Sequence, residues 1–204
     1  EVCLGYTKEE AIKEAKRCIQ CKKPTCVPLC PVSIDIPGFI KKIADEEFEE
    51  AAQILAKYSA LPAVCGRVCP QEDQCESTCI LGRKGDSIAI GKLERFAADW
   101  AIEKGIKLGS TKEANGHKVA VIGSGPAGVA CAGELAREGY EVKIFEALHE
   151  PGGVFVYGIP EFRLPSDKIV QVEINNLKEL GVDIETNVIV GRTITIEDIF
   201  EEGY

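Results

Sequence analysis

The chain has 204 residues, of which 45% are hydrophobic and 28% charged, and its formal net charge is −9. This is the composition of a folded globular protein and excludes a disordered chain. The most apolar stretch, residues 119–136, contains Pro126, Glu134 and four glycines, so no membrane-spanning helix is expected. An acidic chain with scattered Lys and Arg is also not expected to bind nucleic acid.

The termini and the cysteine content suggest where the chain comes from. It begins at Glu1 and contains no Met, so we expect a processed or excised part of a longer protein. No secretory signal pattern precedes the ten cysteines, which favours a reducing, cytoplasmic setting.

Nine of the ten cysteines lie in the first 79 residues, where the predicted elements are helices. A capping box formed by Thr7 and Glu10 predicts a short helix that leads into Cys18. Further helices are predicted over residues 39–43, 45–55 and 87–104, the second with Asp45 as its N-cap. This pattern predicts a helical domain over residues 1–108, and the polar composition of residues 109–117 is typical of a linker.

The remaining residues, 118–204, predict alternating strands and helices. Strands at 118–122 and 141–145 flank a helix at 126–138, which is a βαβ unit and implies a parallel sheet. A helix at 166–180, a strand at 182–185, a further strand at 188–190 and a helix at 193–200 follow. We therefore expect the N-terminal part of a Rossmann-type domain.

The cysteines form two groups with spacings typical of iron–sulfur sites. The first reads Cys18-x2-Cys21-x4-Cys26-x3-Cys30-Pro31, and the second reads Cys65-x3-Cys69-Pro70-x4-Cys75-x3-Cys79. Bacterial ferredoxins use the related pattern C-x2-C-x2-C-x3-C-P, in which the last cysteine ligates the other cluster. The spacing therefore favours iron–sulfur clusters, with Cys30 in a second one.

Three other uses of these thiols compete with clusters. Disulfides need an oxidising compartment, and a redox sensor needs exposed thiols of low pKa. Structural zinc is the stronger alternative, although zinc prefers tighter cysteine pairs, and it would make the chain a non-redox, zinc-stapled nucleotide-binding module. Cys3 and Cys131 are expected to be bystanders, with Cys131 packed inside a helix, and spacing leaves Cys65 ambiguous.

A strand, the pattern G-x-G-x-x-G and the start of a helix occur together at residues 118–128. Gly123 permits the tight turn, Gly125 lets the backbone approach a pyrophosphate, and Gly128 lets the helix pack close to the strand. The helix begins with Pro126 and Ala127, and its free N–H groups form an anion site. This context predicts a dinucleotide site.

The nature of the dinucleotide depends on three later residues. Glu146 closes the second strand, where an acid accepts a ribose hydroxyl and disfavours the 2′-phosphate of NADP. Gly152 and Gly153 would let a second loop approach the pyrophosphate, which favours FAD over NAD, unless they form only an ordinary turn. His117 and His149 lie beside loops without an acid or nucleophile pattern, so no catalytic residue is predicted.

With these residues in view, the chain resembles the N-terminal part of the small (beta) subunit of NADPH-dependent glutamate synthase. The same module is similar to the large subunit of NADH-dependent reduced ferredoxin:NADP oxidoreductase and to the N-terminal region of dihydropyrimidine dehydrogenase. The resemblance is carried by residues 17–21 (RCIQC), 30–32 (CPV), 34–40 (IDIPGFI), 65–70 (CGRVCP) and 158–165 (GIPEFRLP).

The resemblance implies a multi-domain chain: an all-α bis-[4Fe-4S] ferredoxin-like helical domain followed by an incomplete α/β Rossmann-type FAD-binding domain. One [4Fe-4S] cluster would be held by Cys18, Cys21, Cys26 and Cys79. The other would be held by Cys30, Cys69, Cys75 and a non-cysteine ligand, Glu94, with Cys65 as a non-ligand. Without the resemblance, Glu94 would be predicted to be an exposed helix residue. FAD would lie on Gly123, Gly125, Gly128, Glu146 and Gly153.

The resemblance also implies an activity. NAD(P)H would reduce FAD, and the two clusters would carry single electrons to a partner, either the large subunit of glutamate synthase or a ferredoxin-linked subunit. The NAD(P)H domain of this family comes later in the sequence, so we expect the 204 residues not to be active alone.

Overall fold

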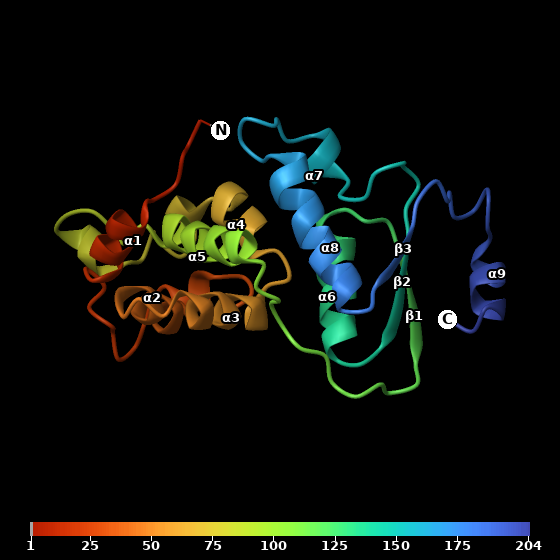
Figure 1. Ribbon diagram of the computed structural model, residues 1–204, viewed down its shortest axis with the longest axis horizontal. Helices are drawn as coiled ribbons and strands as arrows, with labels where there is room; N and C mark the ends of the chain where they lie inside the picture. Colours follow the sequence, from red (N-terminus) through yellow and green to blue (C-terminus); the bar gives the residue numbers. More distant parts are fainter. Residues whose placement is uncertain (1) are drawn as a thin grey trace. The chain divides into compact units, whose positions relative to one another are not determined.

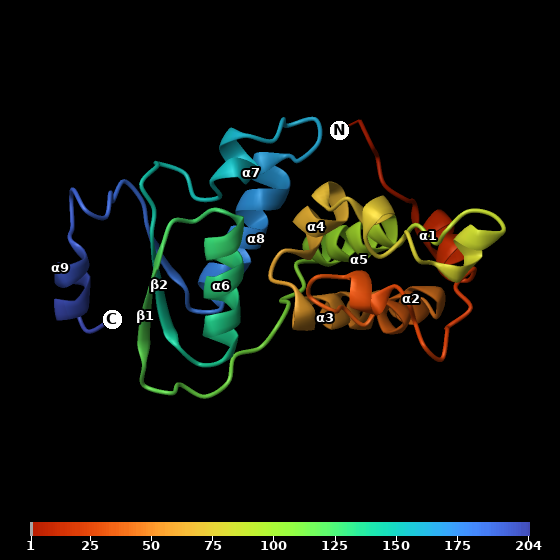
Figure 2. The ribbon, with the colours of Figure 1, turned by 180° about the vertical axis from the view of Figure 1, so that it is seen from behind.

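The computed structural model describes residues 2–204, and within them the chain forms two compact units. The first unit ends at Leu108, and the second extends from Gly109 to Tyr204. Figures 1 and 2 show the elements of each unit from opposite sides. No helix in the described part of the chain is long and apolar enough to cross a membrane.

The first unit is helical, as predicted. Helices α4 and α5 lie over α2 and α3 in both views (Figures 1 and 2). The α-helices are α1 (Lys8–Ala15), α2 (Ile36–Ala44), α3 (Phe48–Tyr58), α4 (Pro62–Val68) and α5 (Ile90–Lys104). Short 3-10 turns lie between them: η1 (Val27–Leu29), η2 (Gln71–Asp73) and η3 (Ile80–Arg83). Helix α4 was not predicted, since its seven residues are too few to show a helical period.

The sequence signals at the helix ends were right at α1 and wrong at α3. At α1 the capping box is present, because the Glu10 N–H donates to Thr7 Oγ1 and the Thr7 N–H donates to Glu10 Oε2. Asp45 instead caps the C-terminus of α2, and its carboxylate pairs with Lys41. The chain then passes through a positive φ of 63° at Glu46, which puts the start of α3 two residues later than predicted.

The core of the first unit is built on one face of α5. Leu93, Ala97 and Ala101 are fully buried there, as their helical spacing predicted. The ring of Phe48 from α3 packs edge-on against Phe96 of α5 at 5.3 Å between centroids. Helix α5 therefore supports the loops that carry the cysteines.

A buried ion network joins α4 to α5. The Arg67 guanidinium donates to both carboxylate oxygens of Asp99, at 2.7 and 2.8 Å, and Arg95 Nε lies 3.3 Å from the same carboxylate. The side chains of Arg67 and Arg95 are only 4% and 7% exposed. Desolvated cations depend on their carboxylate partner, so this network holds the two helices together.

Replacing Asp99 by alanine is expected to destabilise the first unit by about 3 kcal/mol, because it removes the carboxylate that two buried guanidinium groups contact. The matched control is Asp45→Ala, which breaks an exposed pair with Lys41 and should cost less than about 0.5 kcal/mol. Chemical denaturation of both variants measures the difference. Equal stability of the two variants would contradict the role given to the network.

The second unit is a small parallel sheet with helices on its faces. Strands β1 (Lys118–Ile122), β2 (Glu141–Phe145) and β3 (Asp183–Glu185) pair in the order β1-β2-β3. Helices α6 (Pro126–Arg137) and α8 (Gln171–Glu179) cover one face, and α9 (Ile196–Glu201) lies on the other side (Figures 1 and 2). A short helix, α7 (Val154–Tyr157), lies between β2 and α8 in the sequence. The carboxyl ends of all three strands therefore meet at one edge.

Three details of the second unit differ from prediction. The helix at 166–180 begins as a π-helical turn, η4 (Ser166–Val170), before α8. The strand at 188–190 is reduced to an isolated bridge between Val190 and Ile194. Cys131 is exposed, contrary to prediction, because the buried face of α6 is made by Val129, Ala132 and Ala136.

Candidate iron–sulfur and dinucleotide sites

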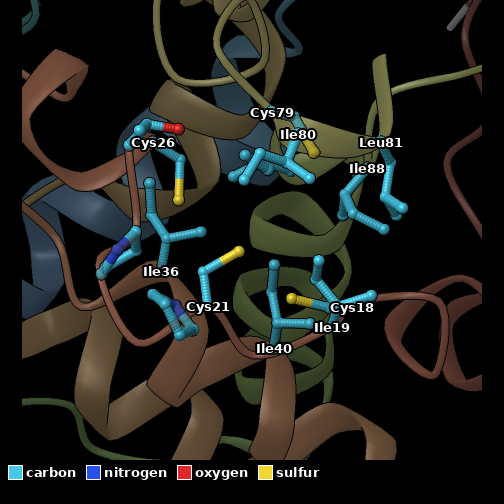
Figure 3. A pocket seen from close by; sticks show the side chains of 14 residues that line it. Cys18, Ile19, Cys21, Cys26, Ile36, Ile40, Cys79, Ile80, Leu81 and Ile88 are labelled. Carbon is cyan, nitrogen blue, oxygen red and sulfur yellow. The ribbon is translucent and has the colours of Figure 1, made fainter. Parts of the chain in front are cut away.

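Four cysteines from two distant segments of the first unit line one pocket. They are Cys18, Cys21, Cys26 and Cys79, and Figure 3 shows their sulfur atoms among apolar side chains such as Ile36 and Ile40. These are the four residues that the resemblance assigned to one cluster. The structure therefore brings Cys79 to the group at residues 18–26, which spacing alone does not do.

A reciprocal pair of hydrogen bonds ties the two segments together. The Thr25 hydroxyl donates to the Thr78 carbonyl at 2.7 Å, and the Thr78 hydroxyl donates to the Thr25 carbonyl at 3.0 Å. Each threonine immediately precedes a cysteine of the pocket, so the pair fixes Cys26 beside Cys79. The sequence signal for this contact is weak, since it is only a Thr-Cys dipeptide in both groups.

Burial and mutual charge both raise the pKa of thiols in this pocket. Burial raises the pKa of Cys26 to about 11, and negative charge on Cys18 and Cys79 adds to this shift. Burial also raises the pKa of Cys18, with further contributions from charge on Cys21 and Cys79. Four thiolates in this pocket therefore repel one another unless a cation binds there, as it would in a metal site.

Structural zinc and an iron–sulfur cluster need different arrangements of cysteine ligands. Structural zinc needs four donors at about 2.3 Å from one point. Nowhere in residues 2–204 do three His, Cys, Asp or Glu side chains converge in that way. An iron–sulfur cluster instead takes cysteines spread around a larger inorganic core. Four cysteines are among the residues that line this pocket.

Two members of the second predicted set of ligands, Cys75 and Cys30, lie at the core of the first unit. Cys75 is buried, and burial raises the pKa of its thiol to about 12. Negative charge on Glu76, Glu94 and Cys30 adds to this shift. Cys30 packs against the core that contains Cys75, although α2, α3 and α4 separate the two residues in the sequence.

Cys69, the remaining cysteine of the second predicted set, forms a hydrogen bond with Cys65. A hydrogen bond from the Cys65 thiol lowers the pKa of Cys69 to about 7, and the same bond, together with burial, raises the pKa of Cys65. The hydroxyl of Ser59 lies 3.8 Å from the Cys65 sulfur. Charge on Glu94 also raises the pKa of Cys65. Cys65, which spacing left ambiguous, therefore donates to Cys69, one of the predicted ligands.

Glu94 is 6% exposed, so its prediction as an exposed helix residue was wrong. It faces the interior from α5, next to Leu93 at the centre of the core. A buried carboxylate is costly unless it is paired or binds a metal. The ligand role of Glu94 stays a prediction of the resemblance.

Replacing Glu94 by cysteine is expected to keep the iron content and to change the midpoint potential of one cluster, because potential depends on ligand type and net charge. Glu94→Ala should instead lower the iron content by about half, since it removes one corner of one cluster. Iron analysis and a potentiometric titration followed by electron paramagnetic resonance measure both effects. Unchanged potentials in Glu94→Cys would contradict the assignment.

In the second unit the glycine-rich loop lies at the carboxyl end of β1. The Gly123 N–H donates to the Phe145 carbonyl at 2.8 Å, and Gly123 has a φ of 92° that favours glycine. A Cβ on Gly128 would lie 2.0 Å from the Gly123 carbonyl oxygen, so α6 packs directly against the loop. A Cβ on Gly125 would meet nothing within 4 Å, which leaves its backbone open to a pyrophosphate. Pro126 and Ala127 form the first turn of α6 behind it.

The loop at Gly152 and Gly153 packs against the glycine-rich loop. Both residues have positive φ, and a Cβ on Gly153 would lie 2.8 Å from the Gly125 Cα. Gly153 is also the N-cap of α7. The two glycines thus do more than make a turn, because they bring a second stretch of backbone to the anion site.

Glu146 lies between these two loops and is 5% exposed. Its Oε2 accepts the Ser124 N–H at 2.8 Å and the Ser124 hydroxyl, and its Oε1 accepts the Leu148 N–H at 2.7 Å. These hydrogen bonds outweigh burial and lower the pKa of Glu146, which therefore carries a negative charge. His117 and His149 are both exposed, and the His149 ring packs on Tyr157.

Comparison with known proteins finds a different family match in each of the two units. Residues 1–106 match the family of dihydropyrimidine dehydrogenase domain II, which holds a 4Fe-4S cluster. The chain belongs to this family. Residues 121–164, which carry both glycine loops and Glu146, match an NAD(P)-binding Rossmann-like domain. The expected fold, a helical iron–sulfur domain followed by the start of a Rossmann-like domain, is thus confirmed at this level.

The relatives are redox proteins. The chain is 39% identical over its full length to the NAD-dependent dihydropyrimidine dehydrogenase subunit PreT of Escherichia coli K12, of which it covers 49%. It is 35% identical over 98% of its length to the glutamate synthase [NADPH] small chain of Azospirillum brasilense, of which it covers 42%. The putative oxidoreductase UacF of Escherichia coli K12 is 38% identical over 99% of the chain, which covers 32% of it. The chain thus spans half or less of the length of these relatives.

Proposed function

We propose that this chain is the electron-transfer part of an iron–sulfur flavoprotein oxidoreductase. In the whole protein, electrons from NAD(P)H would pass through FAD and two [4Fe-4S] clusters to a partner subunit. The observation that carries the proposal is the pocket in which Cys18, Cys21 and Cys26 meet Cys79 among apolar side chains. The match of residues 1–106 to a 4Fe-4S domain family supports the same proposal.

The surroundings of the two predicted ligand sets differ, which bears on the potentials of the proposed clusters. The walls of the pocket are apolar while its cysteines are half-buried, whereas Cys75 and Glu94 of the second set are buried. Exclusion of water and the number of hydrogen bonds to sulfur both tune the potential of a cluster. Two sites with different ligands and different burial would therefore have different potentials, as a relay requires.

In the second unit, the glycine loops and Glu146 supply an FAD site. The open face of Gly125 and the N-terminus of α6 would hold the pyrophosphate, and Glu146 would accept a ribose hydroxyl. When bound, FAD accepts a hydride and releases single electrons. The match to an NAD(P)-binding Rossmann-like domain supports a dinucleotide at this site.

For the partner, we propose the large subunit of a glutamate synthase. The relatives named as glutamate synthase small chains support this choice, at 35% identity over 98–99% of the chain. A second candidate is a dihydropyrimidine dehydrogenase partner, favoured by the 39% identity to PreT. A ferredoxin-linked subunit is a third acceptor of the same chemistry. The partner's substrate site lies on another chain, so reconstitution with each partner distinguishes them.

The first test is an anaerobic visible spectrum of the purified chain before and after dithionite, with iron, sulfide, zinc and flavin analysis. We expect a brown chain with about eight irons, because two [4Fe-4S] clusters would be present, and partial bleaching on reduction. A structured flavin band would add support for the FAD site. A colourless chain that holds zinc would overturn the proposal, since zinc is not redox-active.

A further inference from the structure

One buried serine joins three loops of the second unit. Ser124 is 0% exposed and lies between the first two glycines of the G-x-G-x-x-G pattern. Its hydroxyl and its N–H both donate to Oε2 of Glu146, at the end of β2. The Gly152 N–H donates to the Ser124 Oγ at 3.0 Å. A single side chain thus links the glycine-rich loop, the acid and the second glycine loop.

The numbers of donors and acceptors on Ser124 and Glu146 decide which group donates in each hydrogen bond. A serine hydroxyl has one proton to donate, and here that proton goes to the Glu146 carboxylate while the oxygen accepts from Gly152. A carboxylate oxygen accepts about two bonds, so Ser124 occupies Oε2 with its N–H and its O–H. Oε1 accepts the Leu148 N–H, and the Ala147 N–H also contributes a hydrogen bond to this carboxylate.

We propose that Ser124 is a positioning residue for the dinucleotide. Its hydroxyl holds Oε2 of Glu146, so that Oε1 accepts a hydroxyl of the adenosine ribose, and it holds the Gly152 loop against the pyrophosphate site. The proposal rests on FAD binding by the second unit, as proposed above. It goes beyond the glycine pattern, in which the residue at this position is unspecified.

The test is FAD affinity of the chain with Ser124→Ala, measured by flavin fluorescence titration. We expect affinity to fall by about tenfold or more, because the change removes a buried hydrogen bond to a charged group. ADP, which has the same ribose and pyrophosphate, should lose affinity by the same factor. Ser124→Cys keeps the shape and a weak donor, so its FAD affinity should lie between those of the unsubstituted chain and Ser124→Ala.

The matched control is Ser166→Ala. Ser166 is also buried in the second unit, but among the described residues its hydroxyl has no hydrogen-bond partner. Its loss should leave FAD and ADP binding unchanged. Iron content reports on the first unit and should be the same in all variants.

A double-mutant cycle with Glu146→Gln separates positioning from packing. If Ser124 acts through Glu146, the loss caused by Ser124→Ala should be much smaller in the Glu146→Gln background. Additive losses, unchanged affinity in Ser124→Ala, or unfolding of the second unit in both Ser124 variants would overturn the inference. Failure of the unsubstituted chain to bind either FAD or ADP would overturn the proposed FAD site itself, and so differs from those outcomes.

Discussion

Replacing Cys79 by alanine is expected to remove one of the two proposed clusters and to lower the iron and sulfide content by about half. Cys79 is the one pocket cysteine that comes from the second cysteine group, so its loss opens one corner of the site. Zinc and iron analysis with an anaerobic visible spectrum measures the effect. We also expect the remaining cluster to keep its own potential, since its ligands are a separate set.

Cys131→Ala is the matched control for this experiment. Cys131 is exposed on α6 in the second unit and takes no part in either group, so iron and sulfide should stay unchanged. If Cys79→Ala also retained full iron, the pocket would not be the cluster site. If it lost all iron, the two sites would assemble together and not independently.

Alanine substitutions at two glycines of the same motif are expected to have different effects, one on the stability of the second unit and the other on FAD affinity. Gly128→Ala puts a Cβ 2.0 Å from the Gly123 carbonyl oxygen, so α6 must move away from β1. Overpacking of this kind costs about 3 kcal/mol, and we expect the second unit to lose that much stability even without ligand. FAD binding should be lost as a consequence.

Gly125→Ala is expected to leave the ligand-free fold intact. Gly125 has φ −68° and ψ 179°, which alanine adopts easily, and its added Cβ would meet nothing within 4 Å. Stability should change by less than about 0.5 kcal/mol. FAD affinity should nevertheless fall about tenfold to hundredfold, because the methyl group would occupy the approach of the pyrophosphate to backbone N–H groups.

Chemical denaturation and FAD titration of both variants distinguish these expectations. The combination that supports the site is a destabilised Gly128→Ala and a stable Gly125→Ala that binds FAD weakly. A stable Gly125→Ala with normal FAD affinity would mean that the open face of Gly125 is not where the pyrophosphate lies.

Local pattern predicted most of the elements and the dinucleotide loop. The strands at 118–122 and 141–145 were confirmed at the same residues, because short apolar runs with flanking glycines are strong local signals. The capping box at Thr7 and the end of the helix predicted over residues 87–104 were right for the same reason. The start of α3 was wrong, since the acid at Asp45 could cap either the helix before it or the helix after it.

The cysteine pattern indicated a cluster domain, but spacing could not say which thiols share a site. The fold answers this, because the reciprocal bonds of Thr25 and Thr78 bring Cys26 and Cys79 together. The sequence also could not predict which polar side chains are buried. The helical position of Glu94 predicts an exposed side chain, yet Glu94 is in the interior. Cys131 shows the opposite error, since it is exposed on a helix where small residues are mostly buried.

The helical and α/β halves, the glycine-rich loop and the candidate ligands can thus be predicted from neighbouring residues alone. Three features needed the packed fold: Cys79 joins the group at residues 18–26, Glu94 is buried, and Ser124 links Glu146 to Gly152. Those contacts join residues far apart in the chain, and their geometry depends on how helices and strands pack.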